Sequence, residues 1–318
     1  MSFKIVGIGE VLWDLLPAGP QLGGAPANFA YHTHALGAHA SVVKRVGKDG
    51  FGQAIRERFE QQGIADGTVQ VDDAAPTGTV SVELTDRGIP DYVIHENVAW
   101  DRLAVTSAGM TAVQQAHAVC FGSLAQRGEI SRASIQKLVA AAPAHAWRVF
   151  DINLRQKYFS RSVIEQSLQL ANVLKLNDGE LPILAELFGL PGSTRQHIEL
   201  LAIKFNLQLV ALTRGPAGSL LFQNGQWSDC PSIPITVVDT VGAGDAFTAA
   251  LVMGLLQKKP LDEINSQADQ VARHVCSCAG ATPPLPKAIC DQFSHYAPTH
   301  KIPPKLAGEL RILNGATK

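Results

Sequence analysis

The sequence predicts an α/β fold in which a mostly parallel sheet carries helices on both faces. Short apolar runs rich in β-branched residues, such as those at 147–153, 172–177 and 207–213, alternate with segments of helical period. Strands and helices that alternate in this way build a parallel sheet, because each crossover helix packs back onto the sheet. The 318 residues suffice for one large domain of this class or two small ones. Ligands of such sheets bind where the carboxyl ends of the strands meet.

The elements can be placed in order along the chain. A strand at 4–10 precedes a helix that runs from Pro26 toward Leu36 and stops at Gly37. Proline at the start of a helix and glycine just past its end are the usual terminal residues. The same patterns place strands at 41–47, 147–153, 172–177 and 207–213, and helices at about 52–62, 178–189 and 193–206.

One region, between residues 77 and 100, departs from this alternation. Both 77–85 and 90–100 alternate apolar and polar residues, with the turn-like "DRGIP" between them, and this pattern predicts a β-hairpin. We expect a small β-sheet lid formed by about residues 11–23 and 77–99, placed where insertions often determine specificity. The main domain is expected over 1–290, followed by a C-terminal tail at 291–318 that is extended or forms one short helix.

Composition limits the class of function. A formal net charge of -1 and an isoelectric point near 6.8 show no basic excess of the kind that nucleic acids or anionic membranes attract. The apolar runs are shorter than the roughly 20 residues of a membrane span, and the start of the chain does not resemble a signal peptide. The five cysteines lack paired spacing, and His32 and His34 point to different helix faces, so neither set predicts a metal site. We expect a cytoplasmic protein with a small ligand, and no nucleic-acid or membrane partner.

The stretch "VVDTVGAGDAFTAALVMG" at 237–254 is the first candidate for chemistry. Its glycine-rich part follows the strand-like "ITVVDT" and precedes an apolar helix, so free backbone amides at the helix N-terminus would form an anion site. Gly242 and Gly244 remove side chains that would keep a phosphate from the backbone. Asp245 is placed like a general base beside an oxyanion hole, or it is an acidic first-turn residue that complements the helix dipole. The spacing alone leaves both interpretations open.

A second stretch, at 23–47, favours the interpretation of Asp245 as a base. "GGAPANFAYHTHALGAHASVVKRVG" at 23–47 and "DTVGAGDAFTAALV" at 239–252 resemble the two signature stretches of the ribokinase-like carbohydrate kinases, also called the phosphofructokinase B family. "NDGE" at 177–180 and "TRGPAGSLL" at 213–221 extend the resemblance to roughly residues 3–286. "IGEVLWDLLP", "QLGGAPANFAYH", "FGSLAQR" and "FDINLRQKYFS" are most similar to fructokinases. The resemblance implies a three-layer α/β/α sandwich with a small β-sheet lid.

The resemblance also implies a reaction, the ATP-dependent phosphorylation of a sugar hydroxyl. Asp245 would take the proton from the terminal hydroxyl of the sugar. The amides of Gly242, Ala243 and Gly244 would stabilise the transferring γ-phosphoryl group, since this chemistry depends mainly on positioning and charge neutralisation. The chain contains no G-x-x-x-x-G-K-[ST] motif, and "GIGEVL" lacks the third glycine of a dinucleotide fingerprint.

Sugar contacts are implied for a group of polar residues and one glycine. The D-x-N-x-R pattern that begins at Asp151 occurs in fructokinases and in 2-keto-3-deoxygluconate kinases, and it does not distinguish them. His95 is a candidate for sugar contact because it lies in the predicted hairpin; the alternative is that it is simply a solvent-exposed residue. For one member, Asn28, an internal hydrogen bond at the helix start is the alternative. The full set is Asp14, Gly24, Asn28, Asn153, Arg155 and His95.

On the nucleotide side, the resemblance implies ATP, Mg²⁺ and K⁺ as ligands. Asn177 and Glu180 would organise Mg²⁺ and the phosphates largely through water, unless Glu180 is an ordinary solvent-facing helix residue. Small residues in a turn would let the backbone approach ATP, and a plain β-turn between strands explains them equally. That turn is formed by Thr213, Gly215 and Gly218, and the loop that would hold a monovalent cation contains Asp239, Val241 and Gly280.

The leading functional hypothesis is a fructokinase that makes fructose 6-phosphate from fructose and MgATP. Close alternatives are a 2-keto-3-deoxygluconate kinase and a ribose or nucleoside kinase. A sugar-binding regulator without turnover has no need of a base such as Asp245. A nicotinamide-dependent oxidoreductase would require the complete glycine fingerprint. The resemblance leaves a homodimer through the lid and a monomer both open.

Overall fold

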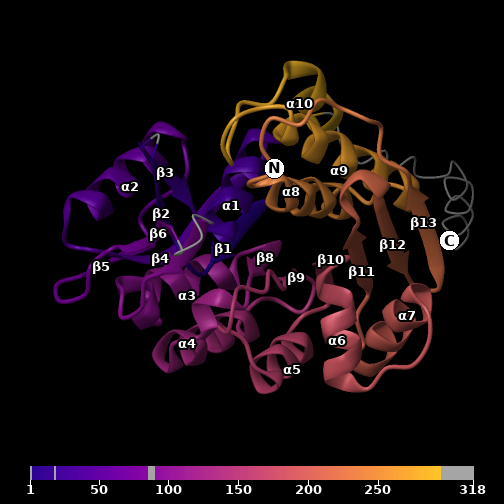
Figure 1. Ribbon diagram of the computed structural model, residues 1–318, viewed down its shortest axis with the longest axis horizontal. Coiled ribbons are helices and arrows are strands. Elements are labelled where there is room, and N and C mark those ends of the chain that lie inside the picture. The colour runs from indigo at the N-terminus through magenta and orange to yellow at the C-terminus, as the bar shows by residue number, and fades with distance from the viewer. Residues whose placement is uncertain (1, 18, 85–89, 295–318) are drawn as a thin grey trace, which may run out of the picture.

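The computed structural model describes residues 2–17, 19–84 and 90–294. The part of the expected turn at 86–89 and the tail from residue 295 lie outside the described residues. Within them, one large sheet of nine strands and one small sheet of four strands form the framework (Figure 1). The large sheet contains, in spatial order, β13 (Gln226–Cys230), β12 (Ser219–Gln223), β11 (Leu209–Thr213), β10 (Val173–Asn177), β9 (Trp147–Asp151), β8 (Ala118–Phe121), β1 (Lys4–Ile8), β4 (His39–Gly47) and β5 (Val69–Asp72).

The large sheet is parallel from β11 to β5, and near its other edge β12 pairs antiparallel with both β11 and β13. Neighbouring residues of its strands point to opposite faces, and in β1 both Ile5 and Val6 are at most 1% exposed. A sheet that is buried on both faces needs apolar residues at successive positions. This need explains the continuous apolar runs of the sequence.

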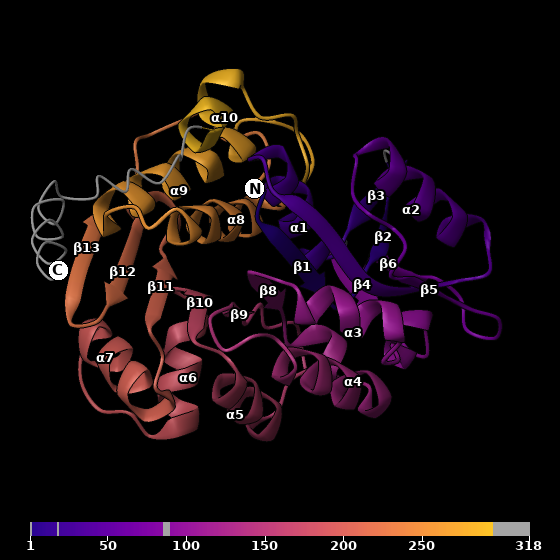
Figure 2. The same cartoon turned by 180° about the vertical axis from the view of Figure 1, so that it is seen from behind.

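Helices cover both faces of this sheet, as Figures 1 and 2 show from opposite sides. One apolar cluster joins the sheet to α3–α7, and a second joins its other face to α1, α8, α9 and α10. The expected α/β/α sandwich is therefore confirmed. The helices are α1 (Ala25–Ala35), α2 (Gly50–Gln61), α3 (Ser107–Gln114), α4 (Glu129–Ala140), α5 (Arg161–Leu170), α6 (Glu180–Phe188), α7 (Thr194–Phe205), α8 (Ala243–Leu256), α9 (Leu261–Cys276) and α10 (Lys287–Ser294).

The small sheet lies beside the N-terminal part of the large one (Figure 1). Its strand order is β3-β2-β6-β7, and the two central strands, β2 and β6, pair in parallel. The expected hairpin is the antiparallel pair of β6 and β7, and the expected third segment is β2. The strands are β2 (Leu12–Leu16), β3 (Gly19–Gly23), β6 (Gly78–Leu84) and β7 (Pro90–Ile94). These strands lie within the segments 11–23 and 77–99 that were expected to form the lid, and we call this small sheet the lid; its closure over a ligand stays a prediction.

The structure corrects one local expectation, in the segment before α8. The strand-like "ITVVDT" at 235–240 belongs to no strand, and its Val237 and Val238 are 57% and 61% exposed. β-Branched residues favour extended backbone, but a strand also needs a neighbour, and this segment instead donates from Val238 N to the Cys276 carbonyl. The domain boundary expected at residue 290 stays a prediction; residue 290 lies within α10, whose Phe293 is buried. No helix within the described ranges combines the length and apolar character that a bilayer crossing requires.

Candidate active site

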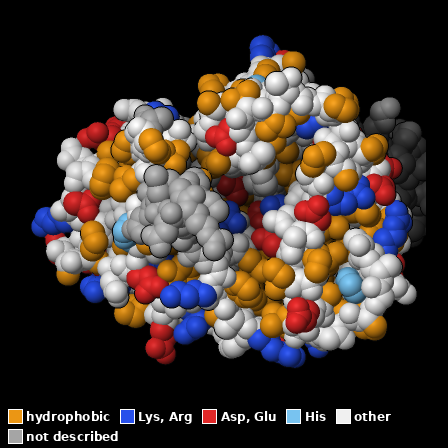
Figure 3. Space-filling view, viewed as in Figure 1, with side chains coloured by type: hydrophobic (Ala, Val, Ile, Leu, Met, Phe, Trp, Pro, Cys, Tyr) orange, Lys and Arg blue, Asp and Glu red, His pale blue; other side chains and the backbone are white. Residues whose placement is uncertain are grey.

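The predicted residues come from segments that lie far apart in the sequence and meet at one edge of the large sheet. They follow the carboxyl ends of β9, β10 and β11, begin α1 and α8, or lie in the lid. In the space-filling view, acidic and basic side chains gather in a hollow at the middle of this face (Figure 3). The fold thus builds the site where parallel sheets usually bind ligands.

Asp245 lies in the first turn of α8 and is half-buried. The amide nitrogen Nδ2 of Asn28, in α1, donates to its Oδ2 at 2.8 Å. Burial and the negative charge of Asp151 raise the pKa of Asp245 to about 7, while Asn28 and the positive charges of Lys175 and Arg155 act in the opposite direction. A carboxylate with this pKa exchanges protons readily near neutral pH, as a general base must.

The turn before Asp245 exposes backbone amides. Gly242 caps α8 with φ 78°, a left-handed conformation that glycine adopts without strain, and a Cβ there would lie 2.5 Å from the Ala281 carbonyl oxygen. The Ala243 amide donates to the Thr240 carbonyl at 3.3 Å. Among the hydrogen bonds of the described residues, none is donated by the amides of Gly242 and Gly244. Two free amides at a helix N-terminus form an anion site.

Three of the predicted sugar residues come from the lid strand β2 and the start of α1. Asp14 is in β2, and burial raises the pKa of its carboxyl group, an effect that the nearby Arg155 reduces. Gly24 precedes α1 with φ 114°, and a Cβ on it would lie 2.7 Å from the carbonyl oxygen of Glu10. Glycine at position 24 is therefore required by the close approach of two backbone segments. Asn28 is almost fully buried, and its hydrogen bond reaches α8 rather than its own helix start.

The loop after β9 presents Asn153 and Arg155. Asn153 has φ 44°, a left-handed conformation that asparagine tolerates better than most residues. Arg155 is exposed and donates only to the neighbouring carbonyl of Leu154 at 3.2 Å within the described residues. His95 follows β7 in the lid, where its ring lies 3.0 Å from Ser81 Oγ and its side chain is exposed. Arg155 thus lies close enough to Asp14 and Asp245 to lower the pKa of both, whereas Asn153 shares its loop and His95 lies on the lid.

Three side chains of the main domain hold the lid strand β7, and we call them the lid anchors: Arg127, Gln156 and Tyr158. Each donates a hydrogen bond to a main-chain carbonyl of β7 or of the residue after it, Arg127 at 2.6 Å and Tyr158 at 3.2 Å. Two anchors belong to the loop that also carries Arg155, so lid and loop are tied together. The acceptors of Arg127, Gln156 and Tyr158 are the carbonyls of His95, Tyr92 and Ile94, respectively.

Asn177 and Glu180 form a closed hydrogen-bonded unit at the end of β10. Asn177 Oδ1 accepts from the amides of Gly179 and Glu180, and Glu180 Oε2 accepts from the amide of Asn177 at 2.8 Å. The other oxygen, Oε1, accepts from the amide of Leu154 at 2.8 Å. Glu180 is only 5% exposed, so it is not a solvent-facing helix residue. Burial raises the pKa of its carboxyl group, and its lone pairs not used by amides suit Mg²⁺ held through water.

Thr213, Gly215 and Gly218 form the tight connection between β11 and β12. Gly218 has φ 86°, and a Cβ there would lie 1.9 Å from the carbonyl oxygen of Cys230. The Arg214 amide donates to the Gly218 carbonyl at 2.7 Å, which closes the turn. The turn between antiparallel strands is thus present, at the same sheet edge as Asn177.

Asp239 joins the loop before α8 to the loop after α9. Its Oδ1 accepts from the amide of Val241 at 3.0 Å and its Oδ2 from the amide of Gly280 at 3.1 Å. Within the described residues, the carbonyls of Asp239, Val241 and Gly280 accept no hydrogen bond. Free carbonyl oxygens around an oriented carboxylate are donors that suit a monovalent cation. No three His, Cys, Asp or Glu side chains cluster as a metal site in the described ranges.

Lys175 and Thr248 were not predicted as site residues, yet both contact Asp151 next to the first turn of α8. Lys175 Nζ lies 3.1 Å from Asp151 Oδ1, and both side chains are buried. Thr248, in α8, donates to the other oxygen of Asp151 at 2.8 Å. A signal existed, since Lys175 interrupts the apolar run "NVLKLN" of a strand expected to be buried. Both carboxylate oxygens of Asp151, the aspartate of the D-x-N-x-R pattern, are therefore occupied by contacts with Lys175 and Thr248.

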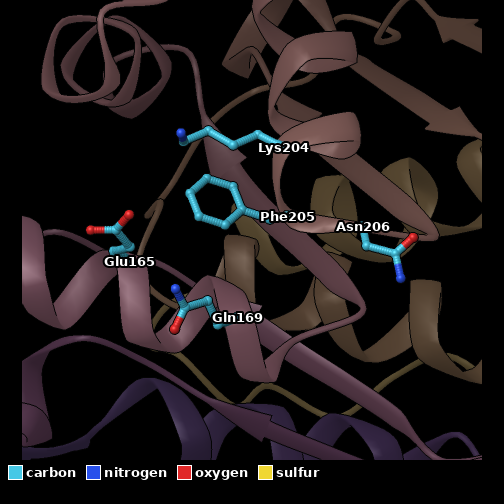
Figure 4. A pocket seen from close by; sticks show the side chains of 5 residues that line it. All are labelled: Glu165, Gln169, Lys204, Phe205 and Asn206. Atoms are coloured by element: carbon cyan, nitrogen blue, oxygen red, sulfur yellow. The ribbon is translucent and has the colours of Figure 1, made fainter.

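A second hollow, of about 290 Å³, lies between α5 and α7 and contains none of the predicted residues (Figure 4). Its charged side chains are Glu165 and Lys204. It opens to solvent and has no buried polar group among its lining residues. The lining residues are Glu165, Gln169, Lys204, Phe205 and Asn206.

Comparisons with known proteins identify the family of this chain. The sequence model of the pfkB family carbohydrate kinases matches residues 20–288. A sugar kinase of Pyrococcus horikoshii is 31% identical over 275 residues, which cover 81% of this chain and 84% of that protein. A fructokinase of Klebsiella pneumoniae is 31% identical over 285 residues, covering 86% of this chain and 91% of that protein.

Solved structures show the same fold. The Pyrococcus horikoshii sugar kinase in complex with ATP superposes with a TM-score of 0.73 at 30% identity, over 87% of this chain and 94% of that one. A fructokinase from Vibrio cholerae, solved with fructose, ADP and potassium ion, gives a TM-score of 0.74 at 22% identity, over 92% and 98% of the two chains. The family match, the two relatives and the shared fold confirm the resemblance: this chain belongs to the pfkB family of carbohydrate kinases.

Proposed function

We propose that the protein transfers the γ-phosphate of MgATP to the terminal hydroxyl of D-fructose, giving fructose 6-phosphate and ADP. The observation that carries this proposal is the placement of Asp245 beside the free amides of Gly242 and Gly244, with its pKa raised to about 7. The similarity to the Klebsiella pneumoniae fructokinase supports fructose as the acceptor. The ATP complex of the Pyrococcus horikoshii relative supports ATP as the donor.

In the proposed reaction, ionised Asp245 accepts the proton of the sugar hydroxyl as its oxygen forms a bond to the γ-phosphorus. The bond between that phosphorus and the β,γ-bridging oxygen breaks, and ADP leaves with the electron pair. The amides of Gly242, Ala243 and Gly244 face the negative charge that spreads over the γ-phosphoryl oxygens. For Ala243 this requires its weak bond to the Thr240 carbonyl to be exchanged for the phosphate.

Two ions would supply further positive charge when bound. Asn177 and Glu180 would hold Mg²⁺ through water, because their oxygens are already oriented by backbone amides. Asp239 and the carbonyls near Val241 and Gly280 would hold K⁺, in line with the potassium ion named for the Vibrio cholerae fructokinase. Thr213, Gly215 and Gly218 would let the backbone approach the nucleotide.

The sugar would lie between lid and main domain. Asp14 and Asn28 would orient its hydroxyls from one side, with the Gly24 backbone close by. Asn153 and Arg155 would do so from the loop after β9, and His95 would approach from the lid. The free, exposed guanidinium of Arg155 favours one second candidate, 2-keto-3-deoxygluconate, whose carboxylate it could pair.

The test is ADP release by the purified protein with MgATP and K⁺, comparing fructose, 2-keto-3-deoxygluconate, ribose and adenosine. Fructose should give the highest kcat/KM. Asp245→Ala should lower kcat by about 10² to 10⁴, the usual cost of losing a positioned base. Asp262→Ala is the matched control, because Asp262 is an exposed first-turn acid of α9. Sugar binding without ADP release in the wild type would instead identify a regulator.

We also propose that the protein works in the cytoplasm, where its substrate ATP is abundant, without a nucleic-acid or membrane partner. A formal net charge of -1 supports the absence of polyanion binding. A homodimer through the lid is a further proposal, because the lid has two edge strands, β3 and β7. Light scattering of the intact protein at several concentrations would distinguish dimer from monomer.

A further inference from the structure

We propose that the buried ion pair of Lys175 and Asp151 is a positioning unit for phosphoryl transfer, which fixes the first turn of α8 and the charge beneath Asp245. This inference rests on the proposed function, because it assigns a role relative to the proposed base. Neither residue belongs to the predicted contacts with sugar, nucleotide or ions. Their position under the transfer site nevertheless connects them to it.

The pair is fixed by the strand register. β9 and β10 are adjacent parallel strands, and Lys175 stands directly opposite Asp151 in the ladder. The Nζ to Oδ1 distance is 3.1 Å, and the side chains are 8% and 6% exposed. Burying two charges costs solvation free energy that a packed apolar pair would not cost, so a buried ion pair is weak evidence for a role in stability. A role in the site explains why charges stand there.

Both partners reach α8. Thr248 Oγ1 donates to Asp151 Oδ2 at 2.8 Å and lies 3.0 Å from the Gly244 carbonyl oxygen, so it ties the first turn of the helix to β9. Lys175 Nζ packs against Gly244 so closely that a Cβ there would lie 2.9 Å from it. The absence of a side chain at Gly244 therefore has two effects: the phosphate can approach its backbone amide, and the ammonium group of Lys175 has room beside it.

The two charges act on Asp245 in opposite directions. Asp151 raises the pKa of Asp245, because a second negative charge nearby disfavours ionisation, and Lys175 lowers it. The other groups that act on or face Asp245 are Asn28 from α1, Arg155 from the loop after β9, Lys44 from β4 and Cys120 from β8.

The pair thus leaves Asp245 with a nearly balanced local charge. Without Lys175, two carboxylates would share a buried region, and Asp245 would hold its proton at neutral pH. Without Asp151, the ammonium group would favour ionised Asp245 but weaken it as a base. The paired arrangement keeps the proposed base ionised near pH 7 and close to the proton affinity that general-base catalysis requires.

The experiment compares Lys175→Met, Asp151→Asn and the double variant. The pH at which kcat/KM for the sugar is half-maximal should rise by about one unit or more in Lys175→Met and fall in Asp151→Asn. The double variant should return close to the wild-type midpoint. Lys287→Met with Asp291→Asn is the matched control, since this pair is exposed, at 86% and 49%, and lies in α10. It should leave the midpoint unchanged.

Two further measurements keep the proposal open to refutation. A ¹³C titration of the Asp245 carboxyl carbon, assigned by its loss in Asp245→Asn, reports the same shifts without turnover. This titration tests the effect of the ion pair on Asp245 even if no tested sugar is phosphorylated. A lack of phosphorylation would count against the proposed function and not against this inference. Thr248→Val should lower kcat at least tenfold with little change in either KM. An unchanged midpoint in either single variant that folds would overturn the proposal. If only the double variant folds, an unchanged kcat in Thr248→Val would overturn it.

Discussion

Asn28 Nδ2 lies 2.8 Å from Asp245 Oδ2, although the two residues are 217 positions apart. The bond joins the start of α1 to the start of α8, so the residue expected to hold the sugar also touches the proposed base. A hydrogen bond donated to a carboxylate favours its ionised form. Asn28 is therefore expected to orient Asp245 and to favour its deprotonation.

Asn28→Asp should raise the pKa of Asp245, because it replaces the donor with a second carboxylate of the same shape. We expect kcat at pH 7 to fall at least tenfold and to recover partly at pH 9. Measurement of kcat for ADP release at several pH values between 7 and 9 checks this. Activity equal to wild type at pH 7 would show that Asn28 does not influence the base.

The wild-type protein should show an acid limb in its pH profile near pH 7. Asp245 is active when deprotonated, and its pKa is raised to about 7, so kcat/KM should fall about tenfold for each pH unit below that value. Measurement of kcat/KM for the sugar at saturating MgATP from pH 5.5 to 8.5 checks this. A flat profile over that range would contradict the assignment of Asp245 as base.

Loss of a lid anchor should open the site to water. Tyr158→Phe removes the donor to the Ile94 carbonyl and to Glu96, so the closed lid should lose about 1 kcal/mol, or about fivefold in population. We expect a sugar KM about fivefold higher and more ADP release without sugar, because a closed lid excludes water. Tyr92→Phe is the control, since it removes an exposed hydroxyl from the same lid strand. Equal kinetics in both variants would argue against an anchoring role.

Stability should depend on pH through His32. This side chain is fully buried, its Nε2 lies 2.9 Å from the Ala281 carbonyl oxygen, and burial lowers its pKa to about 4. The unfolded chain binds a proton at about pH 6.5, so the free energy of unfolding should decrease between pH 6.5 and 4, by roughly 3 kcal/mol in total. Urea unfolding at pH 7.5 and 5 measures this. His32→Gln should reduce the difference, whereas His145→Gln, at an exposed position, should preserve it.

Asp239→Asn should weaken activation by K⁺. The carboxylate accepts from the amides of Val241 and Gly280, and an asparagine offers only one acceptor oxygen for these two donors. We expect the K⁺ concentration for half-maximal kcat to rise severalfold, with sugar KM at saturating K⁺ unchanged. Replacement of K⁺ by a bulky organic cation, which such a loop cannot hold, should lower wild-type kcat. Indifference to K⁺ in the wild type would refute the cation loop.

Local signals predicted much of this fold and site. Glycines before an apolar helix identified the amides around Asp245, and strict alternation identified the hairpin of the lid. The prediction of a strand at Val237 and Val238 was wrong. β-Propensity indicates an extended backbone, but it carries no information about whether a neighbouring strand is present.

Pairings across the sheet were not predictable from one sequence. The contact of Lys175 with Asp151 depends on the register of two strands, and that register follows from the whole core rather than from either segment. The same holds for Arg127, whose guanidinium group stacks 3.9 Å from the ring centre of Trp100 and reaches the lid. A charged residue within an apolar run indicates that a partner exists, but not which one.

The meeting of α1 and α8 has a consequence for the chain during its synthesis. Asn28 leaves the ribosome early, and Asp245 follows only after 217 further residues. At the usual 5 to 20 residues per second, the nascent chain contains Asn28 without Asp245, which is half of the proposed sugar site, for on the order of 10 to 40 seconds. Because α8 supplies the proposed base and follows every strand of the described residues, a chain truncated before α8 can contain the whole sheet and still lack the group proposed to deprotonate the sugar.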